Sequence, residues 1–285
     1  MLRFVACLVV MLAAALPASA ETYFVRRKGN DAADGRTAAT AFKTIARACD
    51  VAQPGDTIYV GGGTHVGPIA PVASGTEEAP IVFVADSSGE MTGDAAPVVV
   101  RAAGGATVIL DAVHHVEVRG FRLETGDSSV RITNAEGIRF VGCRFQRPTQ
   151  TAMTITDARV SISDCLFVRP GHHGVHVSGD SNVSISSSDF NQCGRDAVRI
   201  EQTETSEARI TRCTFTSGAA AGVAVPPGKA IITASLFKAN RGDAVAVAGG
   251  EADVRGWNCT LRANTGSGVS AAEGELELVN CILAN

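Results

Sequence analysis

A motif of about eight residues recurs along most of this chain, and no other feature constrains its fold as strongly. Copies such as IRFVGCRF (138–145), VSISDCLF (160–167) and ARITRCTF (208–215) each end on one apolar residue. The closing residue lies 22 to 25 positions after the previous one, at Leu123, Phe145, Phe167, Phe190, Phe215, Phe237, Leu261 and Leu283. Units this short bury an apolar face only by stacking on their neighbours, so the repeat predicts one elongated solenoid.

The pattern inside each repeat is that of β-strands. Apolar residues alternate with polar ones, as at Val160 and Ile162, and a second alternating run follows a turn, as in GVHV (174–177) and AVRI (197–200). A period of two places alternate side chains in a shared core. Helical periodicity is missing from this region. We therefore predict an all-β fold, a parallel β-helix in which the strands of successive coils stack in register.

The repeat also arranges the cysteines. Five of the seven that follow residue 20 fall in one column, together with Phe121, Ser188 and Ser235; they are Cys143, Cys165, Cys213, Cys259 and Cys281. Free cysteine behaves as a small hydrophobic residue, which suits a stacked core. Neighbouring rungs are about 4.8 Å apart, so a disulfide within the column, such as Cys143–Cys165 or Cys259–Cys281, stays open as an alternative.

Residues 1–20 have the features of a signal peptide. Arg3 precedes the apolar run FVACLVVMLAAAL, and Ala18-Ser19-Ala20 matches a cleavage site. We expect a mature chain that begins at Glu21 and is secreted, whether extracellular, periplasmic or at the cell surface. No later stretch is apolar enough to span a membrane. Without Arg3 the chain has 24 basic and 29 acidic residues, a net charge of −5, which argues against a nucleic-acid partner.

Residues 21–110 do not follow the sequence pattern of the repeats at 111–285. We expect them to form an N-terminal cap and the first coils with their loops. Phe42, Ile45, Ala46, Cys49 and Ala52 have helical spacing and predict one short helix that covers the end of the solenoid. Turn-rich segments at 72–80 and 86–97 are expected to loop out. No capping element follows the last coil in this sequence, so either the sequence is a fragment or something else covers the open edge, and end-to-end association is one way to cover it.

The N-terminal region resembles a known group of proteins. Gly29-Asn30-Asp31, Thr44 to Ala48, Pro54 to Val60 and Gly63-Thr64 resemble the corresponding segments of secreted right-handed parallel β-helix proteins, the pectin-lyase-like group. His65 stands where that group usually has an aromatic residue. The resemblance implies a right-handed β-helix solenoid with a short N-terminal capping helix. It implies the activity only loosely, because the group includes lyases, hydrolases, epimerases and proteins with no assigned reaction.

The second strand of each coil predicts a candidate site. Its outward residues form one column along the solenoid, namely Arg131, Thr154, His176, Arg199, Ala224, Ala246 and Ser270. His176 and Arg199 should lie one rung apart, at about 5 Å, as should His173 and Asp196 at the preceding turn. We expect the catalytic residues to be His176, Arg199, His173 and Asp196. We expect Arg131, Thr154, His172 and Arg195 to bind substrate.

Such a patch suits recognition of a uronate followed by β-elimination. Arginine pairs with the sugar carboxylate and makes the neighbouring C5 proton more acidic, and a neutral histidine or an arginine then removes it. The resemblance implies lyases that use an arginine or lysine base with carboxylate-bound calcium. The acidic calcium cluster is absent from adjacent rungs here, as is the paired aspartate motif of the hydrolases of this fold. Calcium therefore stays open as a cofactor without a clear set of ligands.

The alternative is that these residues are purely structural. Aspartate and histidine in turns then form hydrogen bonds with the local backbone, and the other side chains lie on the surface. A metal site on His172, His173 and His176 is disfavoured, since strand alternation places His173 and His176 on different sides. Two functions follow. The first is an exported protein that binds or acts on a polysaccharide; if it is an enzyme, it is a lyase on uronate-containing glycans, with a glycoside hydrolase as the open alternative. The second is a non-enzymatic surface, structural or carbohydrate-binding protein.

Overall fold

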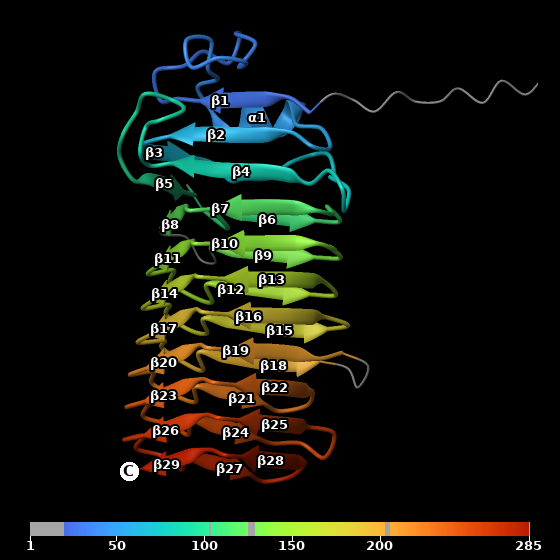
Figure 1. Cartoon of the computed structure of the whole chain (residues 1–285), viewed down its shortest axis with the longest axis vertical. Coiled ribbons are helices and arrows are strands. Elements are labelled where there is room, and N and C mark those ends of the chain that lie inside the picture. The colour runs from blue at the N-terminus through green and yellow to red at the C-terminus, as the bar shows by residue number, and fades with distance from the viewer. Residues whose placement is uncertain (1–19, 103, 125–128, 203–205, 285) are drawn as a thin grey trace, which may run out of the picture.

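The computed structural model describes residues 20–102, 104–124, 129–202 and 206–284, which wind into a right-handed parallel β-helix (Figure 1). Residues 1–19, nearly all of the expected signal peptide, lie outside the described residues. Each coil contributes strands to three parallel sheets in turn. In the described part of the chain no helix is long and apolar enough to cross a membrane.

The first sheet has eleven strands. They are β1 (Thr22–Val25), β2 (Thr57–Gly61), β4 (Ile81–Asp86), β7 (Val116–Arg119), β10 (Ile138–Val141), β13 (Arg159–Ser163), β16 (Asn182–Ser186), β19 (Ala208–Thr211), β22 (Lys229–Thr233), β25 (Asp253–Trp257) and β28 (Glu275–Val279). The second sheet has ten. They are β3 (Gly63–Val66), β5 (Val98–Arg101), β8 (Arg122–Glu124), β11 (Arg144–Gln146), β14 (Leu166–Val168), β17 (Asp189–Asn191), β20 (Thr214–Thr216), β23 (Leu236–Lys238), β26 (Thr260–Arg262) and β29 (Ile282–Ala284).

The third sheet has eight strands. They are β6 (Val108–Asp111), β9 (Val130–Thr133), β12 (Met153–Thr156), β15 (Val175–Gly179), β18 (Val198–Gln202), β21 (Val223–Val225), β24 (Val245–Val247) and β27 (Val269–Ala271). Its strands run opposite to those of the first sheet (Figure 1). Inward side chains of all three sheets share one continuous core, so the outward residues of the first and third sheets face opposite sides of the solenoid.

The strand register confirms the repeat that the sequence predicts. Phe145 pairs with Leu123 on one side and with Phe167 on the other, and the same column continues to Leu283. Five of its members, Phe145, Phe167, Phe190, Phe215 and Phe237, stack with successive ring centroids 4.4 to 5.0 Å apart. Each ring is almost fully buried. Burial of large apolar area together with ring stacking stabilises every coil against its neighbours.

A single residue with positive φ turns the chain from the first sheet into the second. These corner residues are Gly120, Gly142, Asp164, Ser187, Arg212, Ala234, Asn258 and Asn280. Left-handed backbone is costly for residues other than glycine, yet it bends the chain sharply within one residue. The next residue at each corner then points inward, and this is the column of cysteines and serines.

The column packs without cross-links. All seven cysteines of the described chain are free, and all but the half-buried Cys281 are buried. The hydroxyl of Ser188 accepts a 3.1 Å hydrogen bond from the Cys165 N–H, and Ser235 does the same for Cys213. The packing interpretation of the column is therefore confirmed, and neither Cys143–Cys165 nor Cys259–Cys281 forms a disulfide.

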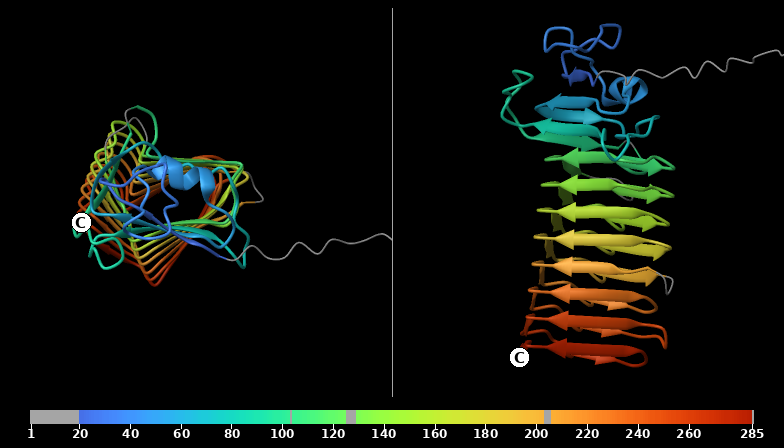
Figure 2. Two further views of the ribbon diagram at one scale, coloured as in Figure 1. Left: turned by 90° about the horizontal axis from the view of Figure 1, so that it is seen from above. Right: turned by 45° about the vertical axis from the view of Figure 1, so that its right-hand side comes forward.

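Helix α1 (Ile45–Val51) covers the N-terminal end of the solenoid, as the left view of Figure 2 shows. The Thr44 hydroxyl caps it by accepting a 3.2 Å hydrogen bond from the Arg47 N–H. Ile45 and Cys49 are buried as expected, but Ala46 is exposed and Ala48 is buried in its place. Ile45, Ala48, Cys49 and Ala52 have the i, i+3, i+4, i+7 spacing of one helix face, and Ala46 lies off that face.

Candidate functional site

The predicted outward column lies on the third sheet. Thr154 pairs with Arg131 on β9 and with His176 on β15, and His176 pairs with Arg199 on β18. The neighbours of each residue along its strand, such as Val175 and Val177, are fully buried. Alternation therefore presents all four polar side chains on the outer face, in the order that the sequence predicts.

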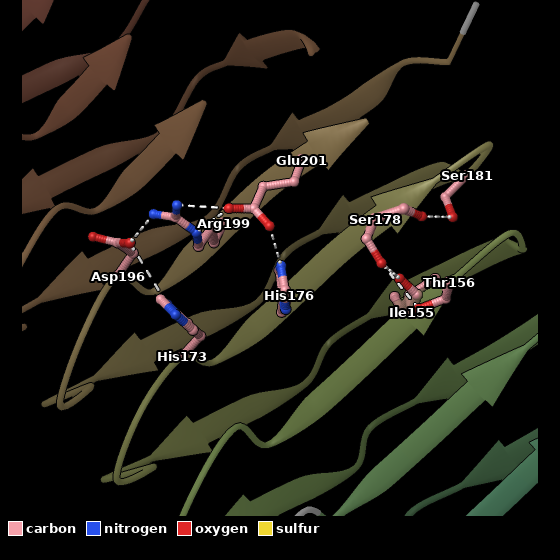
Figure 3. A network of polar contacts seen from close by, with 9 residues as sticks. All are labelled: Ile155, Thr156, His173, His176, Ser178, Ser181, Asp196, Arg199 and Glu201. Carbon is pink, nitrogen blue, oxygen red and sulfur yellow. Dashed lines mark hydrogen bonds and ion pairs between the residues drawn. The ribbon is translucent and has the colours of Figure 1, made fainter. Parts of the chain in front are cut away.

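Arg199 lies at the centre of a polar network (Figure 3). Its Nη1 is 3.3 Å from Oδ2 of Asp196, and its Nε donates a 2.7 Å hydrogen bond to Oε1 of Glu201. The Nη2 atom of the same guanidinium lies 2.6 Å from that oxygen. Arg199 is thus occupied by two carboxylates, which makes it an anchor within the protein and a poor receptor for a sugar carboxylate.

His176 contacts the other oxygen of Glu201, with 3.0 Å between Nε2 and Oε2 (Figure 3). Burial acts to raise the pKa of Glu201, but hydrogen bonds from His176 and Arg199 outweigh it and lower that pKa. Since the carboxylate is ionised and can only accept, Nε2 carries a proton, and in the neutral form of the ring Nδ1 therefore keeps its lone pair. A carboxylate that fixes the tautomer of a histidine in this way prepares the other ring nitrogen to act as a base.

His173 is the buried member of the cluster. Its Nδ1 lies 3.6 Å from Oδ2 of Asp196, and that carboxylate also accepts a 3.1 Å hydrogen bond from the Ala221 N–H through Oδ1. Burial lowers the pKa of His173; Asp196 opposes this, while His176 and Arg199 add to it. At neutral pH, His173 is therefore an uncharged packing partner of Asp196 rather than an acid.

The expectation that His173 and His176 lie on different sides was wrong. Their ring centroids are only 5.7 Å apart. Strand β15 begins at Val175, so His173 belongs to the turn, where strand alternation does not hold. His172 and Arg195 lie in the same two turns and are joined through the backbone, since the Arg195 N–H donates a 3.0 Å hydrogen bond to the His172 carbonyl. The Arg195 side chain is exposed and His172 is half-buried.

Glu201 is the residue that the sequence analysis missed. The outward column was followed only through the residue between Val198 and Ile200, whereas β18 extends to Gln202. Position 201 is the next outward residue of the same strand and pairs with Ser178 of β15. Continuing the alternation by one step would have placed a carboxylate diagonally opposite His176.

The donor set does not fit a calcium ion. Asp196 and Glu201 are the carboxylates of the cluster, and both are ion-paired to Arg199. Calcium requires six to eight oxygen ligands, which two such carboxylates do not supply. Across the described ranges, no three histidine, cysteine, aspartate or glutamate side chains lie together as metal ligands.

Comparisons with known proteins agree with the fold. Residues 106–265 match the family model for the right handed beta helix region, a span of more than half of the chain. A search of curated protein sequences finds no match.

Among solved structures, the pectate lyase Pel9A superimposes with a TM-score of 0.64 at 15% identity, over 94% of this chain and 79% of that chain. A mannuronic acid specific polysaccharide family 6 lyase from human gut microbiota gives 0.58 at 14% identity, over 86% and 64% of the two chains. A rhamnogalacturonan lyase gives 0.52 at 14% identity, over 93% and 85%. At such low identity these likenesses establish the shared fold.

Proposed function

Because the chain belongs to the right-handed β-helix family, we propose that it binds an acidic polysaccharide on the third sheet and cleaves it by β-elimination. The observation that carries the proposal is the His176–Glu201 pair at 3.0 Å, at one end of the column Arg131, Thr154 and His176. Three proteins of similar fold are described as lyases of uronate-containing polysaccharides or of rhamnogalacturonan, which supports the same chemistry here.

The column assigns one role to each residue. Arg131 is exposed at one end, and its guanidinium suits bidentate pairing with a uronate carboxylate. Thr154, one rung further, offers a hydroxyl to the sugar. His176 follows at the next rung, about 10 Å from Arg131 along the stack, so a sugar ring over Thr154 contacts both side chains. Arg199 is assigned a positioning role, since it holds Glu201 against His176.

In the proposed reaction His176 acts as the base. Its unprotonated Nδ1 takes the C5 proton of the uronate, whose carboxylate is neutralised by Arg131. The electron pair of that C–H bond forms the C4–C5 double bond, and the bond between C4 and the bridging oxygen breaks. The departing oxygen takes a proton from water or from the imidazolium. Glu201 stabilises the charge that develops on His176, as a carboxylate beside an imidazolium does.

The test is an elimination assay on pectate, alginate and glycosaminoglycans, each with added calcium and with chelator. Unsaturated uronate is followed by its ultraviolet absorbance. We expect the signal to disappear in His176→Ala, to fall at least tenfold in Arg131→Ala, and to persist in His114→Ala, which removes a histidine near the first sheet. Wild-type protein that gives no signal on any substrate would overturn the lyase proposal.

A non-enzymatic binding role is the second candidate, favoured by one observation. The outward column continues from Arg199 into Ala224, Ala246 and Ser270, which offer no further catalytic groups. Binding without cleavage would give saturable affinity for an acidic oligosaccharide that Arg131→Ala weakens, with no absorbance signal in the elimination assay.

A further inference from the structure

We infer that the outer face of the first sheet carries a second site, which holds an extended uronate-containing oligosaccharide without cleaving it. A groove of about 430 Å³ crosses strands β10, β13, β16 and β19, outside the cluster around His176. The choice of polymer rests on the proposed function, whereas the site itself rests on the groove. Because the first and third sheets face opposite sides of the solenoid, the two sites are separate.

The floor of the groove is one outward column. Arg139, Ser161, Ser184 and Arg209 occupy it on four successive coils, paired in register. Two serine hydroxyls thus lie between two guanidinium groups, whose backbones are three rungs or about 14 Å apart. A linear ligand along the solenoid axis meets one side chain per coil, with a cation at each end and hydroxyls between.

The two arginines are available to a ligand to different degrees. Within the described chain Arg139 makes no ion pair, and it is exposed. Arg209 pairs with Glu207 at 2.7 Å, but its side chain is 66% exposed, and pairs this accessible contribute little stability. A ligand carboxylate therefore replaces or joins Glu207 at small cost.

The walls supply both donors and acceptors. Glu136 and Arg159 line one side as a loose pair 3.8 Å apart, and Glu77 closes the end formed by the loop at 72–80. The Oδ1 atom of Asn182 accepts a 3.1 Å hydrogen bond from the Glu207 N–H, so its amide NH₂ is left to donate. The walls thus place hydrogen-bond acceptors, the carboxylates, beside a donor, the amide. This combination suits a ligand with many hydroxyl groups.

The charged residues of the groove favour a sugar acid over a nucleic acid as the ligand. Among the described residues that line the groove are three glutamates and three arginines, and the only aromatic ring among them is that of His115. The phosphates of a nucleic acid offer no hydrogen-bond donors to these glutamates, and its bases would find few rings for stacking. A sugar acid fits better, because hydroxyls outnumber carboxylates in it. In an extended 1,4-linked glycan, each pyranose advances by close to one rung, so carboxylates near Arg139 and Arg209 are joined by sugars over Ser161 and Ser184.

The test uses chain variants in which the third-sheet site is disabled by Arg131→Ala and His176→Ala together. Binding of fluorescently labelled tetragalacturonate, tetramannuronate and a neutral 1,4-linked hexose tetramer is followed by polarisation. We expect saturable binding of at least one acidic tetramer and weaker binding of the neutral one.

Adding Arg139→Ala and Arg209→Ala should lower the affinity about tenfold or more. The matched control adds Arg122→Ala and Arg144→Ala on the second sheet, which remove the same charge and should change affinity less than twofold.

Equal binding of the neutral tetramer, unchanged affinity in the Arg139/Arg209 variant, or no binding of either acidic tetramer would each overturn the inference. Failure of the proposed function has a different signature, because it appears as missing elimination by the wild-type protein while tetramer binding to the groove persists. Conversely, if Arg139→Ala with Arg209→Ala leaves binding intact while wild-type protein releases unsaturated uronate, only the second site is lost.

Discussion

Glu201 of strand β18 accepts a 3.0 Å hydrogen bond from Nε2 of His176, which lies on the preceding coil. The two residues are 25 positions apart in sequence. Arg199 holds the same carboxylate from its own strand, so the tautomer of His176 is set by two residues of the next coil. A solenoid builds a local arrangement of three groups in this way from residues that one repeat never contains.

Replacing Glu201 by glutamine should make the chain less sensitive to acid. The pKa of Glu201 is lowered in the folded protein, because hydrogen bonds from His176 and Arg199 outweigh the effect of burial. A lowered pKa contributes stability above the unfolded value of about 4.3, and this is lost as pH falls through the folded pKa. The side chain is 35% exposed, so we expect a loss below about 1 kcal/mol at pH 7 in Glu201→Gln.

Urea unfolding of wild type and Glu201→Gln at a series of pH values measures this difference. The two free energies of unfolding should converge as the pH falls below the unfolded value of about 4.3 and through the lower folded pKa of Glu201. A gap that does not shrink over this range would show that the carboxylate charge contributes nothing.

His173 should produce a second, separate loss of stability at mildly acidic pH. Burial lowers the pKa of His173, so the unfolded chain takes up a proton at a higher pH than the folded chain does. Stability then falls as pH drops below the unfolded value of about 6.5 towards the folded pKa. In His173→Gln this part of the pH dependence should vanish. His172→Gln, at the half-exposed neighbour in the same turn, should retain it, and equal profiles for the two variants would contradict the assignment.

The sequence predicts the register of this fold well, because the inward aromatic residues repeat every coil and a shift by one residue would expose them. The pairing of Thr154 with both Arg131 and His176 follows directly from it. The conformation of residues outside the strands is harder to predict from the sequence. His173 lies in a turn, where alternation carries no information, and the corner at Ala234 has left-handed backbone without a glycine to indicate it.

The groove on the first sheet was beyond the sequence analysis for another reason. Alternation alone places Arg139 and Ser161 on an outer face, but it does not say which outer face is hollowed. That depends on the loop at 72–80, where the Gly75 N–H donates a 2.9 Å hydrogen bond to the His114 carbonyl and places Glu77 at one end of the groove. Such a contact between a loop and a turn has no periodic signal.

The thiols should be protected in the native protein and countable after unfolding. Burial raises the pKa of Cys49 and Cys193 to about 12, and that of Cys213 and Cys259 to about 11. Thiolate is the reactive form, so a chain beginning at Glu21 should show one fast thiol at pH 8, that of half-buried Cys281, and seven in denaturant without reductant. Cys281→Ser should remove the fast phase. Fewer than seven thiols in denaturant would mean that a disulfide forms in the column.

Glycine at position 234 should stabilise the protein. Ala234 has a φ of 49° and an exposed side chain, so its methyl group strains the backbone without adding to the core. Glycine removes a steric penalty of about 1 to 2 kcal/mol, against a smaller entropic cost from the more flexible unfolded chain. The Ala234 N–H donates a 3.0 Å hydrogen bond to the Trp257 carbonyl, which glycine keeps.

We expect Ala234→Gly to raise the free energy of unfolding by about 1 kcal/mol in urea titrations. Ala230→Gly, at a buried position of β22, should lower it by a similar amount. Destabilisation by both substitutions would show that the corner tolerates alanine without strain.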